Sequence, residues 1–159
     1  MKKAVWIAGG FCVGILVGCT TAAVVADAPP LEERQPAITA TPGALVLQGA
    51  NAAKREVPGK ATATLFAKGA RAYMGTLEVA PGAGVPEHRD PTEELLYIIE
   101  GSGQVTIDDK VYEVVADSVI YMPAGAKVSF KNGDAPLKAV QVFAEPGPES
   151  KYDAWSPVK

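Results

Sequence analysis

The sequence predicts an all-β fold, an antiparallel sandwich or barrel, and three observations support this class. The chain has 159 residues, which is enough for one domain with a substantial core. It contains 16 glycines and 13 prolines, which fall between short apolar runs. From Ala44 onward these runs read as β-strands, and turn residues separate most of them. The pattern disfavours a helical bundle.

Nine short strands are expected. They are Ala44–Gln48, Ala61–Phe66, Ala72–Val79, Glu94–Ile99, Gln104–Ile107, Val111–Val115, Ser118–Tyr121, Lys127–Phe130 and Leu137–Phe143. The segment Gly101-Ser102-Gly103 joins two of them and opens no helix, so it is interpreted as a hairpin turn and not as a phosphate-binding loop. Close spacing of short strands is typical of all-β domains.

The first 18 residues have the layout of a cleaved export signal. Met1-Lys2-Lys3 is a positive start, and the apolar stretch from Ala4 to Gly18 is shorter than the roughly 20 residues that span a bilayer as a helix. The stretch ends in Leu16-Val17-Gly18-Cys19, which resembles the lipobox of bacterial lipoprotein signals. That resemblance implies cleavage before Cys19 and a fatty-acyl anchor on this cysteine. The alternative is ordinary cleavage after Ala26-Asp27-Ala28, with Cys19 incidental.

The same interpretation predicts a tether and a cellular location. Residues 19–43, the lipidated cysteine and an Ala-, Pro- and Thr-rich stretch, are expected to form a flexible tether. The protein is then expected in the cell envelope, lipid-anchored and facing the periplasm or the exterior. Thr20, which stands where sorting to the inner membrane uses aspartate in enterobacterial lipoproteins, favours the outer membrane if the organism is Gram-negative.

Charge and cysteine content disfavour two further classes. The net charge is −3 and the sequence has no basic cluster, so nucleic acid is not expected as a partner. The two cysteines, Cys12 and Cys19, both lie in the first twenty residues, and removal of the signal would leave the domain without a cysteine pair. Folding is therefore expected to need no disulfide.

Two groups of residues resemble the paired motifs of the cupin superfamily. The first comprises Gly82, His88, Arg89, Asp90, Glu94 and Gly101, and the second comprises Asp117, Pro123, Gly125 and Asn132. The resemblance implies a jelly-roll β-barrel at residues 44–149 with an interior pocket, a motif core at 82–132 and a C-terminal tail at 150–159. The motif pair occurs once, and single cupins of this kind often form homodimers.

The same resemblance implies a metal site of which half is present. Metal-binding cupins use three histidines and one glutamate, and this chain keeps the first histidine as His88 and the glutamate as Glu94. Asp90 and Val128 stand in the places of the other two, and His88 is the only histidine in the chain. If one strand runs from His88 to Glu94, His88, Asp90 and Glu94 share a face and could hold manganese, iron or zinc. Without an ion, one carboxyl is expected to have a raised pKa.

Other residues are candidates for the pocket. Tyr97, Tyr121, Val128 and Gln141 could line its wall, with core packing as the alternative for each. Trp155 in the tail could dock onto the barrel or remain in solvent.

Three functions remain open at this stage. Loss of two of four metal ligands favours a module that binds a small molecule or an envelope protein without turnover. The alternative is a metal-dependent enzyme, an oxygenase, isomerase or lyase, with His88, Asp90 and Glu94 as ligands. A third is a spacer whose interior is packed shut around Val128 and Leu96.

Overall fold

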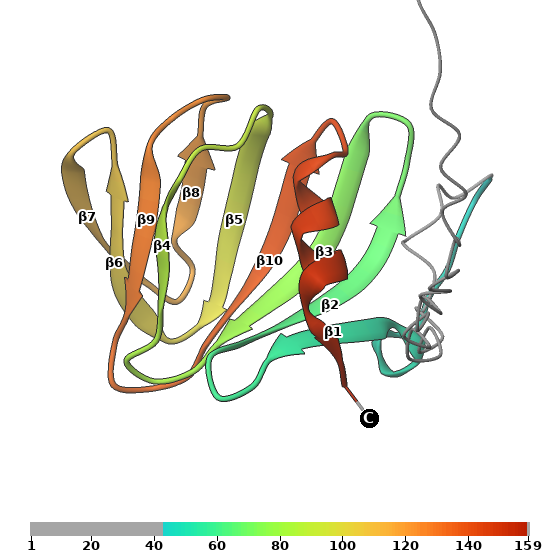
Figure 1. The fold of residues 1–159 in the computed structure, drawn as a ribbon, viewed down its shortest axis with the longest axis horizontal. Coiled ribbons are helices and arrows are strands. Elements are labelled where there is room, and N and C mark those ends of the chain that lie inside the picture. Colours follow the sequence, from blue (N-terminus) through green and yellow to red (C-terminus); the bar gives the residue numbers. More distant parts are fainter. Residues whose placement is uncertain (1–42, 159) are drawn as a thin grey trace, which may run out of the picture. The chain divides into compact units, whose positions relative to one another are not determined.

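The computed structural model describes residues 43–158, which form two β-sheets facing one another (Figure 1). The predicted signal, Cys19 and the tether up to residue 42 lie outside the described residues. No helix among the described residues is long and apolar enough to cross a membrane. The expectation of an all-β jelly-roll barrel is confirmed.

Eleven strands and two short 3₁₀ helices make up the described part of the chain. In chain order they are η1 (Gly49–Asn51), β1 (Ala53–Val57), β2 (Ala61–Lys68), β3 (Ala72–Val79), β4 (Gly84–His88), β5 (Glu93–Glu100), β6 (Ser102–Ile107), β7 (Lys110–Val115), β8 (Val119–Met122), β9 (Val128–Asn132), β10 (Leu137–Ala144), η2 (Pro148–Ala154) and β11 (Ser156–Pro157). One sheet has the order β11-β1-β2-β3-β10-β5-β8 and the other has the order β4-β9-β6-β7.

Eight of the nine expected strands are present within a few residues, and β3 has the predicted bounds. The expected strand at Ala44–Gln48 is wrong, because these residues pair with nothing in either sheet and Val46 is 89% exposed. Strands β1, β4 and β11 were not predicted. β1 contains three consecutive charged residues, and β4 carries a proline, so neither has an ordinary strand pattern.

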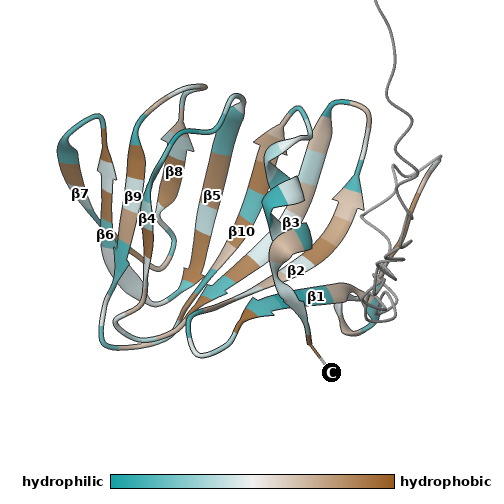
Figure 2. Ribbon diagram, viewed as in Figure 1, coloured by the Kyte–Doolittle hydropathy of each residue, from teal (hydrophilic) through white to brown (hydrophobic). Residues whose placement is uncertain are grey.

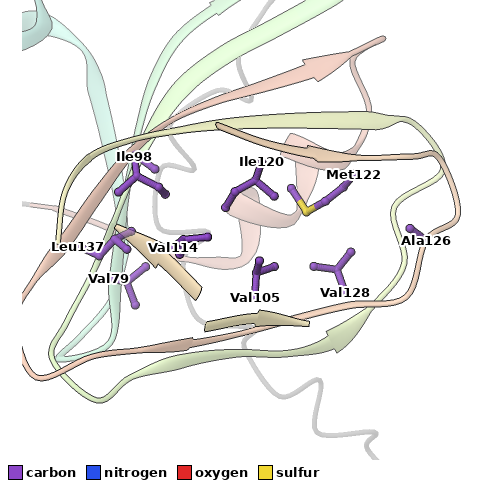
Figure 3. Packing of buried hydrophobic residues seen from close by; sticks show 10 residues of the cluster. Val79, Ile98, Val105, Val114, Ile120, Met122, Ala126, Val128 and Leu137 are labelled. Atoms are coloured by element: carbon purple, nitrogen blue, oxygen red, sulfur yellow. The ribbon is translucent and has the colours of Figure 1, made fainter. Parts of the chain in front are cut away.

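Alternation along the strands places apolar side chains between the sheets. Along β10 every second residue is buried, and β8 buries Ile120 and Met122 while Val119 and Tyr121 face outward. The hydropathy colouring in Figure 2 shows hydrophobic and hydrophilic bands alternating along several strands. Figure 3 shows Ile98, Ile120 and Met122 pointing from the larger sheet towards Val105 and Val128 of the smaller one.

The end of the chain is part of the packed domain. Tyr152 of η2 is 2% exposed and belongs to a second buried cluster with Tyr73 and Phe143. Trp155 packs edge-to-face on Tyr152 with the ring centroids 4.9 Å apart, and β11 pairs with β1. Trp155 therefore docks onto the domain, which was one of its two predicted positions, and does not remain in solvent. The residues expected as a C-terminal tail therefore pack against the larger sheet.

Candidate functional site

A cavity of about 490 Å³ lies between the two sheets. Its walls are mainly aliphatic side chains that also form the buried core, among them Leu77, Leu96, Ile98, Val105, Ile120, Met122, Val128 and Leu137. The hydrophobic core therefore surrounds an open volume instead of filling it. The expectation of an interior packed shut around Val128 and Leu96 does not describe this structure, since both residues line the cavity.

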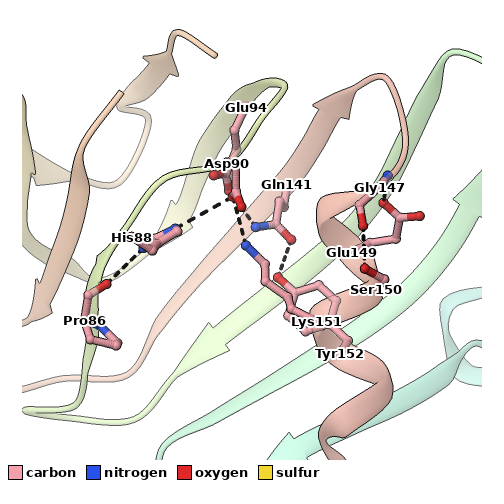
Figure 4. Close-up of polar contacts among 10 residues, drawn as sticks. All are labelled: Pro86, His88, Asp90, Glu94, Gln141, Gly147, Glu149, Ser150, Lys151 and Tyr152. Atoms are coloured by element: carbon pink, nitrogen blue, oxygen red, sulfur yellow. Dashed lines mark hydrogen bonds and ion pairs between the residues drawn. The ribbon is translucent and has the colours of Figure 1, made fainter. Parts of the chain in front are cut away.

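Polar side chains gather along one part of the cavity wall (Figure 4). His88, Asp90 and Glu94 each offer a ligand atom, and these three atoms lie within 4.8 Å of one another. The route by which they meet differs from the expected one. His88 ends β4 in the smaller sheet and Glu94 lies near the start of β5 in the larger sheet, so no single strand runs between them. The crossing of the chain from one sheet to the other brings them together.

Two hydrogen bonds to Gly125 hold the segment that carries Asp90. The Gly125 N–H donates a hydrogen bond of 2.8 Å to the Asp90 carbonyl oxygen, and the Arg89 guanidinium donates to the Gly125 carbonyl oxygen. These bonds join the crossing segment to the turn before β9. Asp90 is thereby held over the polar end of the cavity, with its side chain 16% exposed.

The His88 ring has a defined orientation. Its Nδ1 lies 2.9 Å from the Pro86 carbonyl oxygen, and since a carbonyl can only accept, Nδ1 carries the hydrogen. Nε2 then faces Asp90, at 3.7 Å from Oδ2. This arrangement is common for metal-binding histidines, in which a backbone carbonyl orients the ring and leaves the other nitrogen free to ligate.

Glu94 is a buried carboxyl group in a chain of hydrogen bonds. It is 6% exposed, and its Oε1 accepts a hydrogen bond of 2.6 Å from Gln141 Nε2. Gln141 Oε1 in turn accepts one of 2.6 Å from the Tyr152 hydroxyl. Burial raises the pKa of Glu94, although the Gln141 hydrogen bond and the Lys151 charge oppose the rise. The expected raised pKa is thus found at Glu94, with burial a larger cause than the neighbouring Asp90.

Lys151 is a site residue that the sequence did not indicate. Its Nζ lies 3.0 Å from Asp90 Oδ2 and 4.9 Å from the centroid of the Phe143 ring. Lys151, Tyr152 and Trp155 all line the cavity, and all come from the C-terminal segment that was expected to be a tail. Because η2 begins 47 residues after Gly101, the last residue of the first motif, no local pattern placed this segment at the site.

The four candidate wall residues divide into two pairs. Val128 is directly opposite His88 in the β4–β9 register, and both line the cavity, as does Gln141. The prediction for Tyr97 and Tyr121 is wrong: they are 43% and 51% exposed and bond to Asp117 and Glu93 on the outside. Strand parity explains the correction, because both alternate with inward-facing neighbours such as Leu96 and Ile120.

The donor set fits a divalent cation at three positions. One neutral imidazole and two carboxylates are ligands that zinc, manganese and iron accept, and the His88 Nε2 atom is oriented for the purpose. Oε1 of Glu94 accepts the Gln141 hydrogen bond, and Oδ2 of Asp90 forms the Lys151 ion pair. The second oxygen of each carboxylate could serve as a metal ligand. Val128 adds an apolar surface beside His88, so the protein would offer one nitrogen and two carboxylates.

Comparison with known proteins agrees with this architecture. Residues 75–143 match the family described as a cupin domain. An RmlC-like cupin from Shewanella frigidimarina superimposes with a TM-score of 0.62 at 14% identity, over 69% of this chain and 96% of that one. The polyketide cyclase RemF from Streptomyces resistomycificus superimposes with a TM-score of 0.57 at 19% identity, over 66% and 83% of the two chains. The described residues thus have the cupin fold, and the match to the cupin family covers residues 75–143 of the chain.

Sequence similarity to a curated relative is more local. The tetracenomycin polyketide synthase protein TcmJ from Streptomyces glaucescens is 31% identical over 70 residues, which is 43% of this chain and 47% of TcmJ. This chain thus matches about half the length of that relative. The solved structures above are below 25% identity, so their likeness concerns the fold.

Proposed function

We propose that this cupin domain binds a small, mainly apolar molecule that carries a polar group at one end. The observation that carries the proposal is the cavity of about 490 Å³ with aliphatic walls and one polar cluster. Small-molecule sites in proteins commonly have roughly 300–1,000 Å³, apolar walls and a few placed polar groups. The cluster of His88, Asp90 and Glu94 would orient the polar end of the ligand.

The open core supports binding over a purely structural role. Protein interiors are normally packed as densely as organic crystals, with few voids larger than a water molecule. Ile98, Val105 and Ile120 are each at most 5% exposed and line this cavity, so the surrounding core gives up contacts that a filled interior would make. A spacer domain has no reason to keep such a volume open, whereas a binding domain does.

The second candidate is a metal-dependent enzyme acting in the same cavity. Its support is the donor set of His88, Asp90 and Glu94, together with relatives whose names include a polyketide synthase protein and a polyketide cyclase. A divalent cation held there would supply Lewis-acid chemistry at a substrate oxygen. The chain's own residues would orient that substrate through the aliphatic walls of the cavity.

Filling the cavity is expected to abolish binding of an apolar probe. The test uses the full chain with Cys19→Ser, which serves as the parent protein and is kept in solution without detergent. The uncharged dye N-phenyl-1-naphthylamine should bind this protein, and the fluorescence of the dye should rise. Val105→Trp would place a large ring in the cavity from β6 and weaken binding at least tenfold. Val119→Trp, at a position 70% exposed on β8, is the matched control and should bind as the parent does.

The same titration separates the two candidate functions. Dye binding that is unchanged by a chelator supports a metal-independent binding module, while binding that a chelator abolishes supports the metal-dependent alternative. Equal dye affinity in Val105→Trp and the parent protein would contradict the cavity as the binding site. Thermal unfolding of each variant checks that the fold is retained.

We further propose that the domain acts in the cell envelope, anchored by acyl chains on Cys19. The support is the lipobox-like segment Leu16-Val17-Gly18-Cys19 behind a positive start. Several acyl chains hold a protein to a membrane where a single chain is marginal. The ligand or an envelope protein would then be met at the membrane surface, and Thr20 favours the outer membrane in a Gram-negative host.

Replacing Cys19 by serine is expected to release the protein from membranes. In a bacterial host the parent chain should partition into the detergent phase of Triton X-114 and incorporate a clickable palmitate analogue. The Cys19→Ser variant should do neither, because the thioether cannot form without the thiol. The matched control is Cys12→Ser, which changes the other cysteine and should partition as the parent does.

A further inference from the structure

The Lys151 ammonium is a positive charge within the candidate site, and Asp90 and Phe143 surround it. Its ammonium lies 3.0 Å from Asp90 Oδ2, the same oxygen that lies 3.7 Å from His88 Nε2 (Figure 4). The positive group of Lys151 and the ring nitrogen of His88 therefore converge on one carboxylate oxygen. A divalent ion coordinated by His88 and Asp90 would lie close to this ammonium, whichever oxygen of Asp90 it used, and the two positive charges would repel each other.

Packing holds Lys151 in this position. The ammonium lies over the Phe143 ring, 4.9 Å from its centroid, and Phe143 is fully buried. The next residue, Tyr152, is 2% exposed and hydrogen-bonded to Gln141, which itself bonds to Glu94. Lys151 is thus attached to a fixed part of the wall and differs from a lysine that moves freely in solvent.

The start of η2 is fixed as well. Glu149 forms an ion pair of 2.7 Å with Lys68 on β2 and accepts a hydrogen bond of 2.5 Å from the Gly147 N–H. Contacts on both sides of Lys151 therefore keep the backbone of η2 against the larger sheet. Moving the ammonium away from Asp90 requires a change in side-chain rotamer or a shift of this anchored helix.

Charge balance gives the position a chemical meaning. Asp90 and Glu94 place two carboxyl groups at the polar end of the cavity, and Lys151 supplies a positive charge between the sheet and these groups. A divalent ion at His88, Asp90 and Glu94 would lie close to the ammonium and be repelled by it in a partly desolvated setting. The ammonium and such an ion would therefore compete for the negative charge of Asp90.

We propose that Lys151 is a built-in cation of this cupin site, which takes the place of a divalent ion at Asp90 and weakens metal binding there. The ion whose binding Lys151 would weaken is a divalent metal such as zinc. The proposal concerns the carboxylate end of the cavity and does not depend on which apolar molecule the cavity binds.

Removal of the Lys151 charge tests the proposal. Lys151→Met keeps a flexible side chain of similar bulk but removes the ammonium, and with it both the ion pair with Asp90 and the cation–π contact with Phe143. The full chain, purified in mild detergent without a histidine tag, is titrated with Zn²⁺ by calorimetry and with Co²⁺ by visible absorption. We expect Lys151→Met to bind Zn²⁺ at least tenfold more tightly than the parent, which corresponds to about 1.4 kcal/mol.

A matched lysine controls for net charge. Lys138 has a side chain 37% exposed and an ion pair of 2.9 Å with Glu78, compared with 36% and 3.0 Å for Lys151. Lys138→Met should leave Zn²⁺ affinity unchanged. Lys151→Arg retains the charge and should also bind Zn²⁺ no more tightly than the parent.

Two results would overturn the proposal. One is equal Zn²⁺ affinity in Lys151→Met and the parent, with both proteins folded by circular dichroism; the other is an equal gain in Lys138→Met. If Lys151→Met does not fold, Lys151→Gln replaces it under the same criteria. The added change Asp90→Asn should remove the gain, and a gain that survives it would place the zinc elsewhere. Dye binding to the cavity is measured in parallel, so failure here is distinct from failure of the proposed binding function.

Discussion

Replacing Val128 by histidine is expected to raise the affinity of this site for zinc by roughly 100-fold. Val128 is directly opposite His88 in the β4–β9 register, and side chains opposite one another on adjacent strands have their Cβ atoms about 5 Å apart. Both residues line the cavity, so the new imidazole would face the same ion as His88. Groups that only orient a ligand already change metal affinity 10–100-fold, and an added ligand should reach the upper end.

The measurement is a Zn²⁺ titration of the Val128→His variant and its parent, with Co²⁺ absorption reporting a new nitrogen ligand. Without metal, the variant should be less stable, because an imidazole replaces an aliphatic side chain that is 8% exposed in the core. Saturating zinc should more than restore the loss. Val119→His, on the outer face of β8 and 70% exposed, is the control for an added histidine. Equal zinc affinity in the two variants would show that position 128 does not face the metal-binding residues.

Apolar residues mark the strands that sequence patterns predicted. β3, β5 and β10 each carry an alternating or near-continuous apolar run and lie inside the larger sheet, where such runs are needed. β1 lies near the edge of that sheet and is strongly charged, so its pairing depends on β2 and not on its own apolar pattern. The apolar run at Ala44–Gln48 shows the converse, because apolar composition alone does not supply a pairing partner.

The site was partly predictable for a similar reason. Spacing within one motif indicated that His88, Asp90 and Glu94 belong together, and the structure brings them within 4.8 Å. Lys151 and Tyr152 reach the same place from η2, and only the folded chain reveals that convergence. Tyr97 and Tyr121 could have been excluded from the sequence, because they have the opposite strand parity to Glu94 and Met122.

Substituting Gly101 by alanine is expected to destabilise the domain by about 3 kcal/mol or more. Gly101 links β5 of the larger sheet to β6 of the smaller one and has a φ of +90°, which residues with a Cβ rarely adopt. A Cβ here would lie 2.5 Å from the Pro136 carbonyl oxygen and 2.6 Å from the Leu137 Cα, both backbone atoms. The left-handed conformation costs about 1 kcal/mol and the overlap about 2 kcal/mol more.

Gly82 separates these two contributions. Its φ is +67°, but a Cβ there would have no heavy atom within 4 Å, so Gly82→Ala should lose only the conformational part, about 1 kcal/mol. Urea unfolding of both variants gives the two free energies, with the difference between them assigned to the backbone contact with β10.

Because β5 carries Glu94 and β6 carries Val105, a shift of the Gly101 link also moves two walls of the cavity relative to each other. Gly101→Ala should therefore weaken dye binding as well as stability, whereas Gly82→Ala should leave dye binding intact. Equal free energies of unfolding in the two variants would contradict this prediction. They would mean that the backbone around Gly101 adjusts to the added Cβ at little cost, and that the cavity does not depend on the geometry of this link.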